Sequence, residues 1–194
     1  MDALFFKIKP SMLLNSSTIG SKWVGITQRT ISDKYIETLV AKFNSEKGVT
    51  LNKKMFIEES NDVFELWVNG KVVGLLTINY ELDTPEKDNR ETLFSCYIGI
   101  NGVFILEKYR DHGLGFLFAE TVSSFLSKNI LFEILRFKNN TNIPELDMTI
   151  HADYESSEGE SFVNMFTEGL CNEGYAIMRK SLGIKEKLSL DAGY

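Results

Sequence analysis

The sequence predicts an α/β fold in which helices lie on the faces of a mixed β-sheet. Two apolar, β-branched runs, residues 63–68 and 71–80, are separated by Asn69-Gly70, a dipeptide that favours the positive φ angles of a two-residue hairpin turn. A third strand-like run, residues 93–106, leads through a glycine-containing loop into residues 116–126, where apolar side chains recur with helical spacing. Strands and helices that alternate in this way predict a layered domain.

The first half of the chain begins with residues 1–20, whose serine, threonine and glycine content indicates an irregular arm. Residues 22–31 are rich in β-formers and predict the first strand. A helix follows, with Ser32 or Asp33 as its N-cap and Gly48 as its stop. The helix has one apolar face, formed by Tyr35, Ile36, Leu39, Val40 and Phe43.

The second half continues with residues 81–91, a polar segment that contains Pro85 and predicts a loop. The sequence leaves open whether the helix of residues 116–126 runs on past Asn129. It then predicts a short strand, a helix that Gly174 terminates, and a final strand, at residues 147–152, 161–171 and 175–182. The predicted order is β-α-β-β-β-α-β-α-β.

Composition restricts the class of protein. A chain of 194 residues with 43% hydrophobic and 25% charged residues suits a single domain, residues 1–194, with the N-terminal arm as an extension. The net charge of -6 argues against nucleic-acid binding, which depends on cationic side chains. Neither a signal peptide nor a run of about 20 apolar residues is visible, so we expect a cytoplasmic protein that is not a membrane protein.

The cysteines and histidines predict no metal site. Cys96 and Cys171 cannot form a disulfide scaffold, and neither has metal-ligand spacing to His112 or His151. A structural role with satisfied hydrogen bonds is the default for His151, which lies in a predicted strand. A solvent-facing side chain is the default for His112, although a phosphate contact is the alternative.

The segment with the strongest chemical signal is Arg110-Asp111-His112-Gly113-Leu114-Gly115, between a predicted strand and a predicted helix. The two glycines allow a tight turn with exposed N–H groups, and a helix N-terminus behind them favours an anion. Arg110 adds donors suited to phosphate. The loop lacks the third glycine of a dinucleotide-binding turn and the Gly-Lys-Ser/Thr of a P-loop. We therefore predict a diphosphate site of another kind.

Arg110, Gly113 and Gly115 match the Arg/Gln-x-x-Gly-x-Gly/Ala pattern of the GNAT acyltransferases, and the chain resembles that superfamily over roughly residues 22–182. The resemblance implies a central, mostly antiparallel twisted sheet flanked by helices, with acetyl-CoA or another coenzyme A thioester as the acyl donor. It implies that the pantetheine arm pairs with backbone near Val103, Phe104 and Ile105. The amides of Asp111, His112, Gly113, Leu114 and Gly115 would hold the pyrophosphate, and Asn164 would correspond to a helix-starting asparagine near the cofactor.

The resemblance also implies direct attack of a primary amine on the thioester, but it assigns no general acid. The family's tyrosine falls on Leu170 or Cys171, neither of which is tyrosine. The candidates for the acid are Cys171, although a lone helical cysteine is more often a buried hydrophobe, together with Tyr154 and Tyr175. The base candidates are Glu81, Tyr97 and Asn101.

The resemblance implies a small-molecule or peptide amine as the acceptor, and the sequence does not choose among such amines. The acidic residues Asp153, Glu155, Glu158 and Glu160 would attract a cationic amine, or form a solvated loop. Two other interpretations stay open: a catalytically inactive acyl-CoA sensor of the same fold, and an unrelated scaffold in which the glycine loop is only a turn. The sequence does not determine the oligomeric state, and a homodimer is one of the alternatives.

Overall fold

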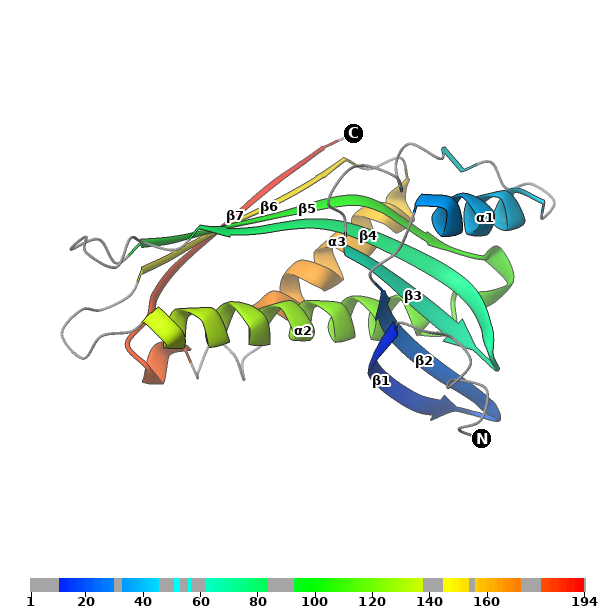
Figure 1. The fold of residues 1–194 in the computed structure, drawn as a ribbon, viewed down its shortest axis with the longest axis horizontal. Coiled ribbons are helices and arrows are strands. Elements are labelled where there is room, and N and C mark those ends of the chain that lie inside the picture. Colours follow the sequence, from blue (N-terminus) through cyan, green and yellow to red (C-terminus); the bar gives the residue numbers. More distant parts are fainter. Residues whose placement is uncertain are drawn as a thin grey trace. The chain divides into compact units, whose positions relative to one another are not determined.

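The computed structural model describes residues 11–29, 33–45, 51–52, 56, 62–83, 93–137, 145–153, 156–171 and 179–193. The chain divides into two compact units: unit 1 contains residues 1–79 and 101–118, and unit 2 contains residues 80–100 and 119–194. Within the described residues seven strands are hydrogen-bonded in chain order, from β1 to β7 (Figure 1). The predicted α/β class is confirmed.

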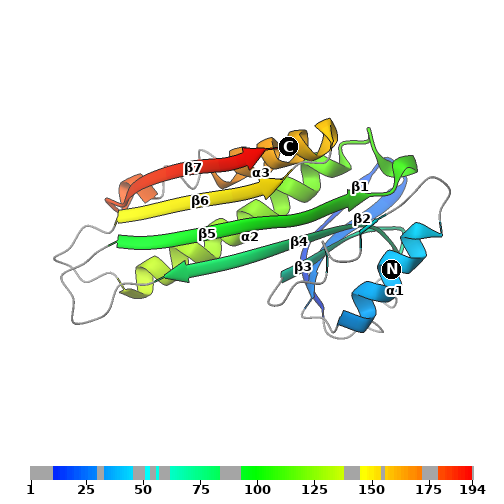
Figure 2. The ribbon, with the colours of Figure 1, turned by 90° about the horizontal axis from the view of Figure 1, so that it is seen from above.

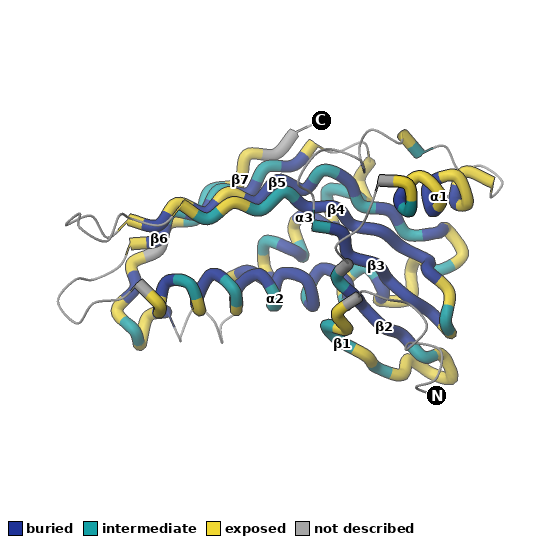
Figure 3. The backbone as a smooth tube through the Cα atoms, in the orientation of Figure 1, coloured by how far each residue is buried: buried dark blue, intermediate teal, exposed yellow. Residues whose placement is uncertain are grey.

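Unit 1 contains an antiparallel ladder. It is formed by β1 (Ser11–Ile19), β2 (Lys22–Arg29), β3 (Asp62–Val68) and the first part of β4 (Lys71–Asp83). The predicted hairpin is confirmed, because Asn69 and Gly70 have φ angles of 48° and 77° between β3 and β4. β3 is buried along almost its whole length (Figure 3).

Helix α1 (Asp33–Asn44) packs against this ladder (Figure 1). Its predicted apolar face is confirmed: Ile36, Leu39, Val40 and Phe43 are buried, and the ring centroid of Phe43 lies 5.3 Å from that of Phe104. A buried carboxylate also joins helix to sheet, since the Tyr35 hydroxyl donates to Glu65 Oε1 at 2.6 Å. Ser32 and Gly48, the predicted boundaries, lie outside the described residues.

Two βαβ crossovers form unit 2. β5 (Leu93–Ile105) pairs in parallel with β6 (Glu145–Asp153), which pairs in parallel with β7 (Lys185–Gly193). From Ala119 onward, α2 (Leu114–Phe137) lies with α3 (Ser157–Leu170) on one face of these strands (Figures 1 and 2). The expectation of a mostly antiparallel sheet is therefore wrong: the sheet is mixed, because a strand that returns through a crossover helix runs parallel to its predecessor.

Two further boundaries differ from the prediction, and one that the sequence left open is decided. Ser11–Ile19, expected in an irregular arm, form β1. The polar side chains of this segment do not predict a strand, and antiparallel pairing with β2 stabilises it. α2 continues past Asn129 to Phe137, which settles the open question of its length. Glu81, expected in a loop, lies in β4.

The last predicted strand is also misplaced. Residues 179–181 are helical, residues 175–178 lie outside the described part together with Gly174, and the last strand is β7. β7 carries many charged residues, so its sequence resembles a solvated tail. Pairing with β6 stabilises it, and Lys185 and Lys187 reach Glu145 and Asp147 at 3.2 and 3.4 Å. No helix in the described part of the chain is both long and apolar enough to cross a bilayer.

Candidate anion-binding site

The candidate site begins where β5 ends. Leu106 is buried, and its N–H donates to Val73 O at 2.9 Å, which holds the end of β5 against β4. A short 3-10 helix, η3 (Glu107–Tyr109), then turns the chain, with Arg110 N–H donating to Glu107 O at 3.0 Å. The backbone is thus fixed before the glycines are reached.

The turn into α2 exposes backbone N–H groups. Asp111 and Gly113 have positive φ angles of 59° and 71°, and Leu117 N–H makes the first helical bond, to Gly113 O at 3.1 Å. The N–H groups of Leu114, Gly115 and Phe116 therefore have no acceptor within the helix. Together with the partial positive charge at the N-terminus of a 24-residue helix, they form an anion-binding arrangement.

Gly113 leaves room for such an anion. A Cβ atom built on it would meet no heavy atom of the described residues within 4 Å, so they leave the space beside it open. Gly115 differs, because Ile105 Cδ1 lies 3.9 Å from its Cβ position. Positive φ and open space make Gly113 the residue on which the predicted diphosphate site depends most.

Arg110 is held at the end of β5. Its Nε donates to Ile105 O at 2.8 Å, and its guanidinium carbon lies 5.7 Å from the centroid of the Phe104 ring. Arginine has five N–H donors, so this bond orients the guanidinium group and leaves four N–H donors for other acceptors. The exposed guanidinium thus stands at the start of the loop as a fixed positive charge.

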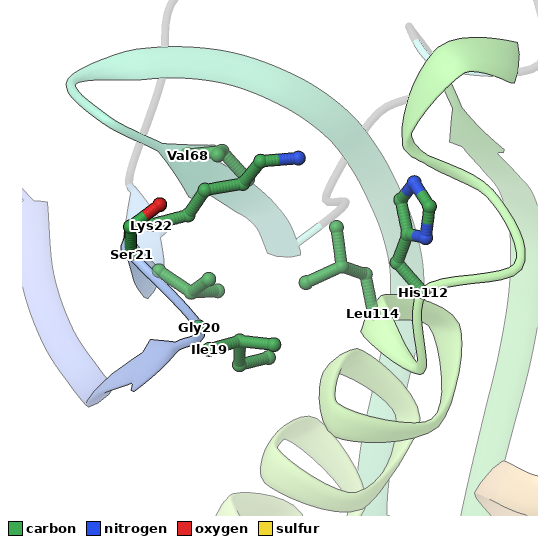
Figure 4. Close-up of a pocket in the computed structure, with 8 residues that line it drawn as sticks. Ile19, Gly20, Ser21, Lys22, Val68, His112 and Leu114 are labelled. Atoms are coloured by element: carbon green, nitrogen blue, oxygen red, sulfur yellow. The ribbon is translucent and has the colours of Figure 1, made fainter.

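A pocket of about 360 Å³ adjoins the loop. His112 and Leu114 form its loop side, and Val68 belongs to β3, while the β1–β2 turn supplies Gly20, Ser21 and Lys22 (Figure 4). His112 and Lys22 extend toward the pocket from its two sides (Figure 4). The loop therefore borders a concave surface to which Lys22 and His112 contribute nitrogen atoms.

Val103, Phe104 and Ile105, the strand residues predicted to pair with the acyl donor, lie in the part of β5 that extends beyond its pairing with β6. The pairing of β5 with β6 ends at Ile100 and Ala152, whereas β5 itself continues to Ile105. Within the described residues, Val103 and Ile105 therefore have no β6 residue in register. The side chain of Phe104 is 8% exposed and packs on Phe43, so this side chain belongs to the core.

The sequence analysis did not identify Gly74, which lies beside the end of β5. A Cβ on Gly74 of β4 would lie 3.0 Å from Phe104 O and 3.2 Å from Ile105 Cγ1. Glycine therefore permits the close approach of β4 to the end of β5. Its place inside an apolar strand was the available signal, since a strand glycine often marks such an approach.

Glu81, Asn164 and Cys171 lie in unit 2, as does Tyr97, whereas Asn101 lies in unit 1. Glu81 and Cys171 are exposed, at β4 and at the C-cap of α3 respectively. Asn164 is an exposed residue in the middle of α3, not at its start, because that helix begins at Ser157. Tyr154 lies outside the described residues, as does Tyr175.

His151 has partners on its own sheet face. Its Nδ1 lies 3.3 Å from Asp191 Oδ2, and its ring stacks with that of Tyr97 at 6.5 Å between centroids. The default structural role for this histidine is consistent with both contacts. Among the described residues, no group of three His, Cys, Asp or Glu side chains has an arrangement that would hold a metal ion.

Comparison with known proteins gives only distant matches. No protein-family model matches the chain, and no curated protein does. A solved aminoglycoside acetyltransferase from an uncultured soil metagenomic sample, in complex with sisomicin, is similar at 13% identity and a TM-score of 0.39, with 74% of this chain and 86% of that chain covered.

Two further solved structures are similar. A ribosomal-protein-alanine N-acetyltransferase from Brucella melitensis matches at 12% identity and a TM-score of 0.40, covering 73% of this chain and 88% of that one. An acetyltransferase of the GNAT family from Streptococcus pneumoniae matches at 17% identity and a TM-score of 0.30, covering 53% and 68%. TM-scores this low carry no argument about this chain, so the function is argued from the site itself.

Proposed function

We propose that this protein is an acyl-CoA-dependent N-acyltransferase that binds the diphosphate of its donor at the Arg110–Gly115 loop. The observation that carries the proposal is the open, positive-φ turn at Gly113, which exposes amide donors at the N-terminus of α2. Arg110 supports it, since its guanidinium is oriented by Ile105 O at the same turn. Coenzyme A contains a diphosphate, and its pantetheine arm needs backbone partners of the kind that β5 offers beyond Ile100.

The reaction follows from the chemistry of a thioester. A neutral amine attacks the carbonyl carbon, the carbon–sulfur bond breaks, and the thiolate leaves with a proton. A backbone N–H near Phe104 or Ile105 would stabilise the negative charge on the carbonyl oxygen. We propose Glu81 as the group that accepts the proton of the amine, and Cys171 or Tyr154 as the proton donor to the thiolate. A cationic amine suits a protein with a net charge of -6.

The first experiment measures thermal stability with acetyl-CoA and with free CoA. A ligand at 100 times its Kd stabilises the folded state by about 2.7 kcal/mol, which corresponds to a rise in Tm of roughly 5–10 °C for a chain of this size. Gly113→Trp places a bulky side chain in the space over the turn, so we expect it to abolish that rise. The absence of a rise in the wild-type protein at millimolar ligand would contradict the proposal and favour the scaffold interpretation.

The matched control is Gly183→Trp. Gly183 has a φ angle of 74° and no heavy atom within 4 Å of its Cβ position, so the substitution imposes a similar backbone strain. Gly183 lines neither the Arg110–Gly115 loop nor the pocket beside it. Its variant should melt at a lower temperature than the wild type but keep the full ligand-induced rise.

Turnover with a panel of amines separates an enzyme from a sensor. Binding of CoA without acyl transfer to any amine would favour the inactive acyl-CoA-binding interpretation. If transfer occurs, Glu81→Gln and Cys171→Ala should lower kcat while leaving the CoA-induced rise in Tm unchanged, provided that these residues have the proposed roles.

A further inference from the structure

The two edge strands of the sheet differ in charge. β1 and β7 are its first and last strands, so within the described part of the chain each has a partner strand on one side only. β7 contains the exposed charged residues Lys185, Lys187 and Asp191, which are of the kind that prevents an edge strand from pairing with another chain. The nine residues of β1 include neither a charged residue nor a proline. The β1 edge therefore lacks the usual protection against a further strand.

Apolar side chains are also exposed along β1. Met12, Leu13 and Ile19 are 49%, 47% and 38% exposed. A single exposed apolar residue is ordinary, but three on one uncharged edge strand form a surface from which a partner strand would exclude water. A second β1 strand suits this edge, because pairing of two uncharged strands brings no like charges together. The composition of β1 therefore favours a second copy of the same strand as its partner.

The pairing of β1 with β2 places Met12 and Ile19 on the same face of the sheet. Met12 is in register with Gln28 and Ile19 with Lys22, and β2 residues six positions apart point to one face. In a regular strand a separation of seven residues would place the two side chains on opposite faces, but a register irregularity within β1 changes the alternation. Because opposed residues of an antiparallel pair share a face, Met12 of one copy can lie opposite Ile19 of another.

We propose that β1 pairs antiparallel with β1 of a second copy of this chain, across a twofold axis at Ser16. This register sets Met12 opposite Ile19 of the partner subunit and Leu13 opposite Thr18 of the partner subunit, so it covers all three exposed apolar side chains. Twofold symmetry is the commonest symmetry of protein dimers and makes each contact twice. The pairing would form roughly six to eight backbone hydrogen bonds, because alternate opposed residues exchange two bonds each, compared with about ten in a typical interface.

The test measures self-association of the whole chain by sedimentation velocity over a range of concentrations, without any ligand, so it does not depend on the proposed acyl donor. The wild type should form dimers. Met12→Lys/Ile19→Lys introduces two pairs of opposed lysines in each dimer, whereas Met12→Lys/Ile19→Glu introduces two lysine–glutamate pairs. The first variant should dimerise roughly tenfold to hundredfold more weakly than the second. Within one chain the two positions are about 20 Å apart along the strand, so they do not pair with each other in a monomer.

A cysteine cross-link tests the position of the twofold axis. Ser16→Cys in a Cys171→Ala background leaves the buried Cys96 as the only other cysteine. Opposed Cα atoms of an antiparallel pair lie about 4.5–5.5 Å apart, which a disulfide can span, so oxidation should link the two copies covalently. Thr18→Cys is the matched control, because Thr18 is also exposed on this strand. The two copies of Thr18 would lie about 14 Å apart, too far for a disulfide.

Several results would overturn the proposal. A wild type that stays monomeric at every concentration would exclude self-pairing and leave an extended segment of another protein as the occupant of the edge. Equal dimerisation of the two charge variants, or no cross-link through Ser16→Cys, would show that the strands are not paired in this register. Leu190→Lys changes a similarly exposed residue on the other edge strand, β7, and should leave the dimer intact. Dissociation by this variant would locate the contact elsewhere.

Discussion

At the scale of single residues, the burial of Glu65 is a feature that the local sequence does not reveal. Glu65 is fully buried in β3, where it accepts hydrogen bonds from Tyr35, Thr27 and Trp67 at 2.6, 3.2 and 3.1 Å. A buried carboxyl group costs free energy unless its oxygens have hydrogen-bond partners, and donors from three elements supply them here. In the sequence Glu65 looks like the polar member of an alternating strand.

Cys96 gives a prediction for alkaline pH. Burial raises the pKa of its thiol to about 12, so the folded protein keeps it neutral where an unfolded chain ionises it. The contribution of this residue to stability is complete below pH of about 9 and is lost as pH rises through the folded-state pKa, with a slope of up to about 1.4 kcal/mol per pH unit. Cys96→Ala should flatten the fall of the unfolding free energy above pH of about 9, measured by denaturant titration.

Cys171→Ala is the comparison for that experiment. Cys171 is exposed, so its removal should leave the alkaline limb as steep as in the wild type. The same contrast predicts that a thiol reagent modifies Cys171 much faster than Cys96 at neutral pH, because only the thiolate is the reactive species. Equal slopes for the wild type and Cys96→Ala would contradict the assigned burial.

At the scale of elements, the contact of α2 with α3 depends on one glycine. A Cβ on Gly169 of α3 would overlap Ser123 Oγ of α2 and lie 3.0 Å from Ser123 Cβ. Ser127 Oγ donates to Leu170 O at 3.4 Å at the same contact. Both residues of each pair lie in unit 2, so the close approach belongs to a single packed body.

Gly169→Ala should therefore destabilise the protein by roughly 1–3 kcal/mol, the usual cost of overpacking, although alanine is the better helix former. Chemical denaturation measures the effect, and Ser123→Gly in the same chain should restore part of the loss. Gly159→Ala is the matched control on α3, since its Cβ would meet only Ser156 Oγ, at an ordinary 3.6 Å. A Gly169→Ala protein as stable as the Gly159→Ala protein would show that the helices are not closely packed.

At the scale of the whole molecule, the two units are joined by continuous elements. β4, β5 and α2 each begin in one unit and end in the other. A unit cannot unfold by itself without ending two strands and a helix in their middle, so we expect one cooperative transition. The calorimetric and van't Hoff enthalpies of unfolding should agree, and fluorescence and circular dichroism should give the same midpoint. Two separate transitions would contradict the prediction of a single domain.

The sequence by itself determined those features that arise from local chemistry. The Asn69-Gly70 turn, the apolar face of α1 and the strand–loop–helix around Gly113 all follow from φ preferences and side-chain periodicity within a few residues. β1 and β7 could not be found in this way, because their polar sequences become strands only through hydrogen bonds to β2 and β6.

The tertiary structure alone decided which distant residues meet. It brought Lys22 and Lys108 to the ring of Tyr109, and it let β4 approach the end of β5 at Gly74. Their separation along the chain leaves no periodic pattern by which a sequence could indicate either contact. The candidate anion-binding loop could therefore be predicted from one segment, whereas the pocket beside it required the pairing of strands that the sequence does not specify locally.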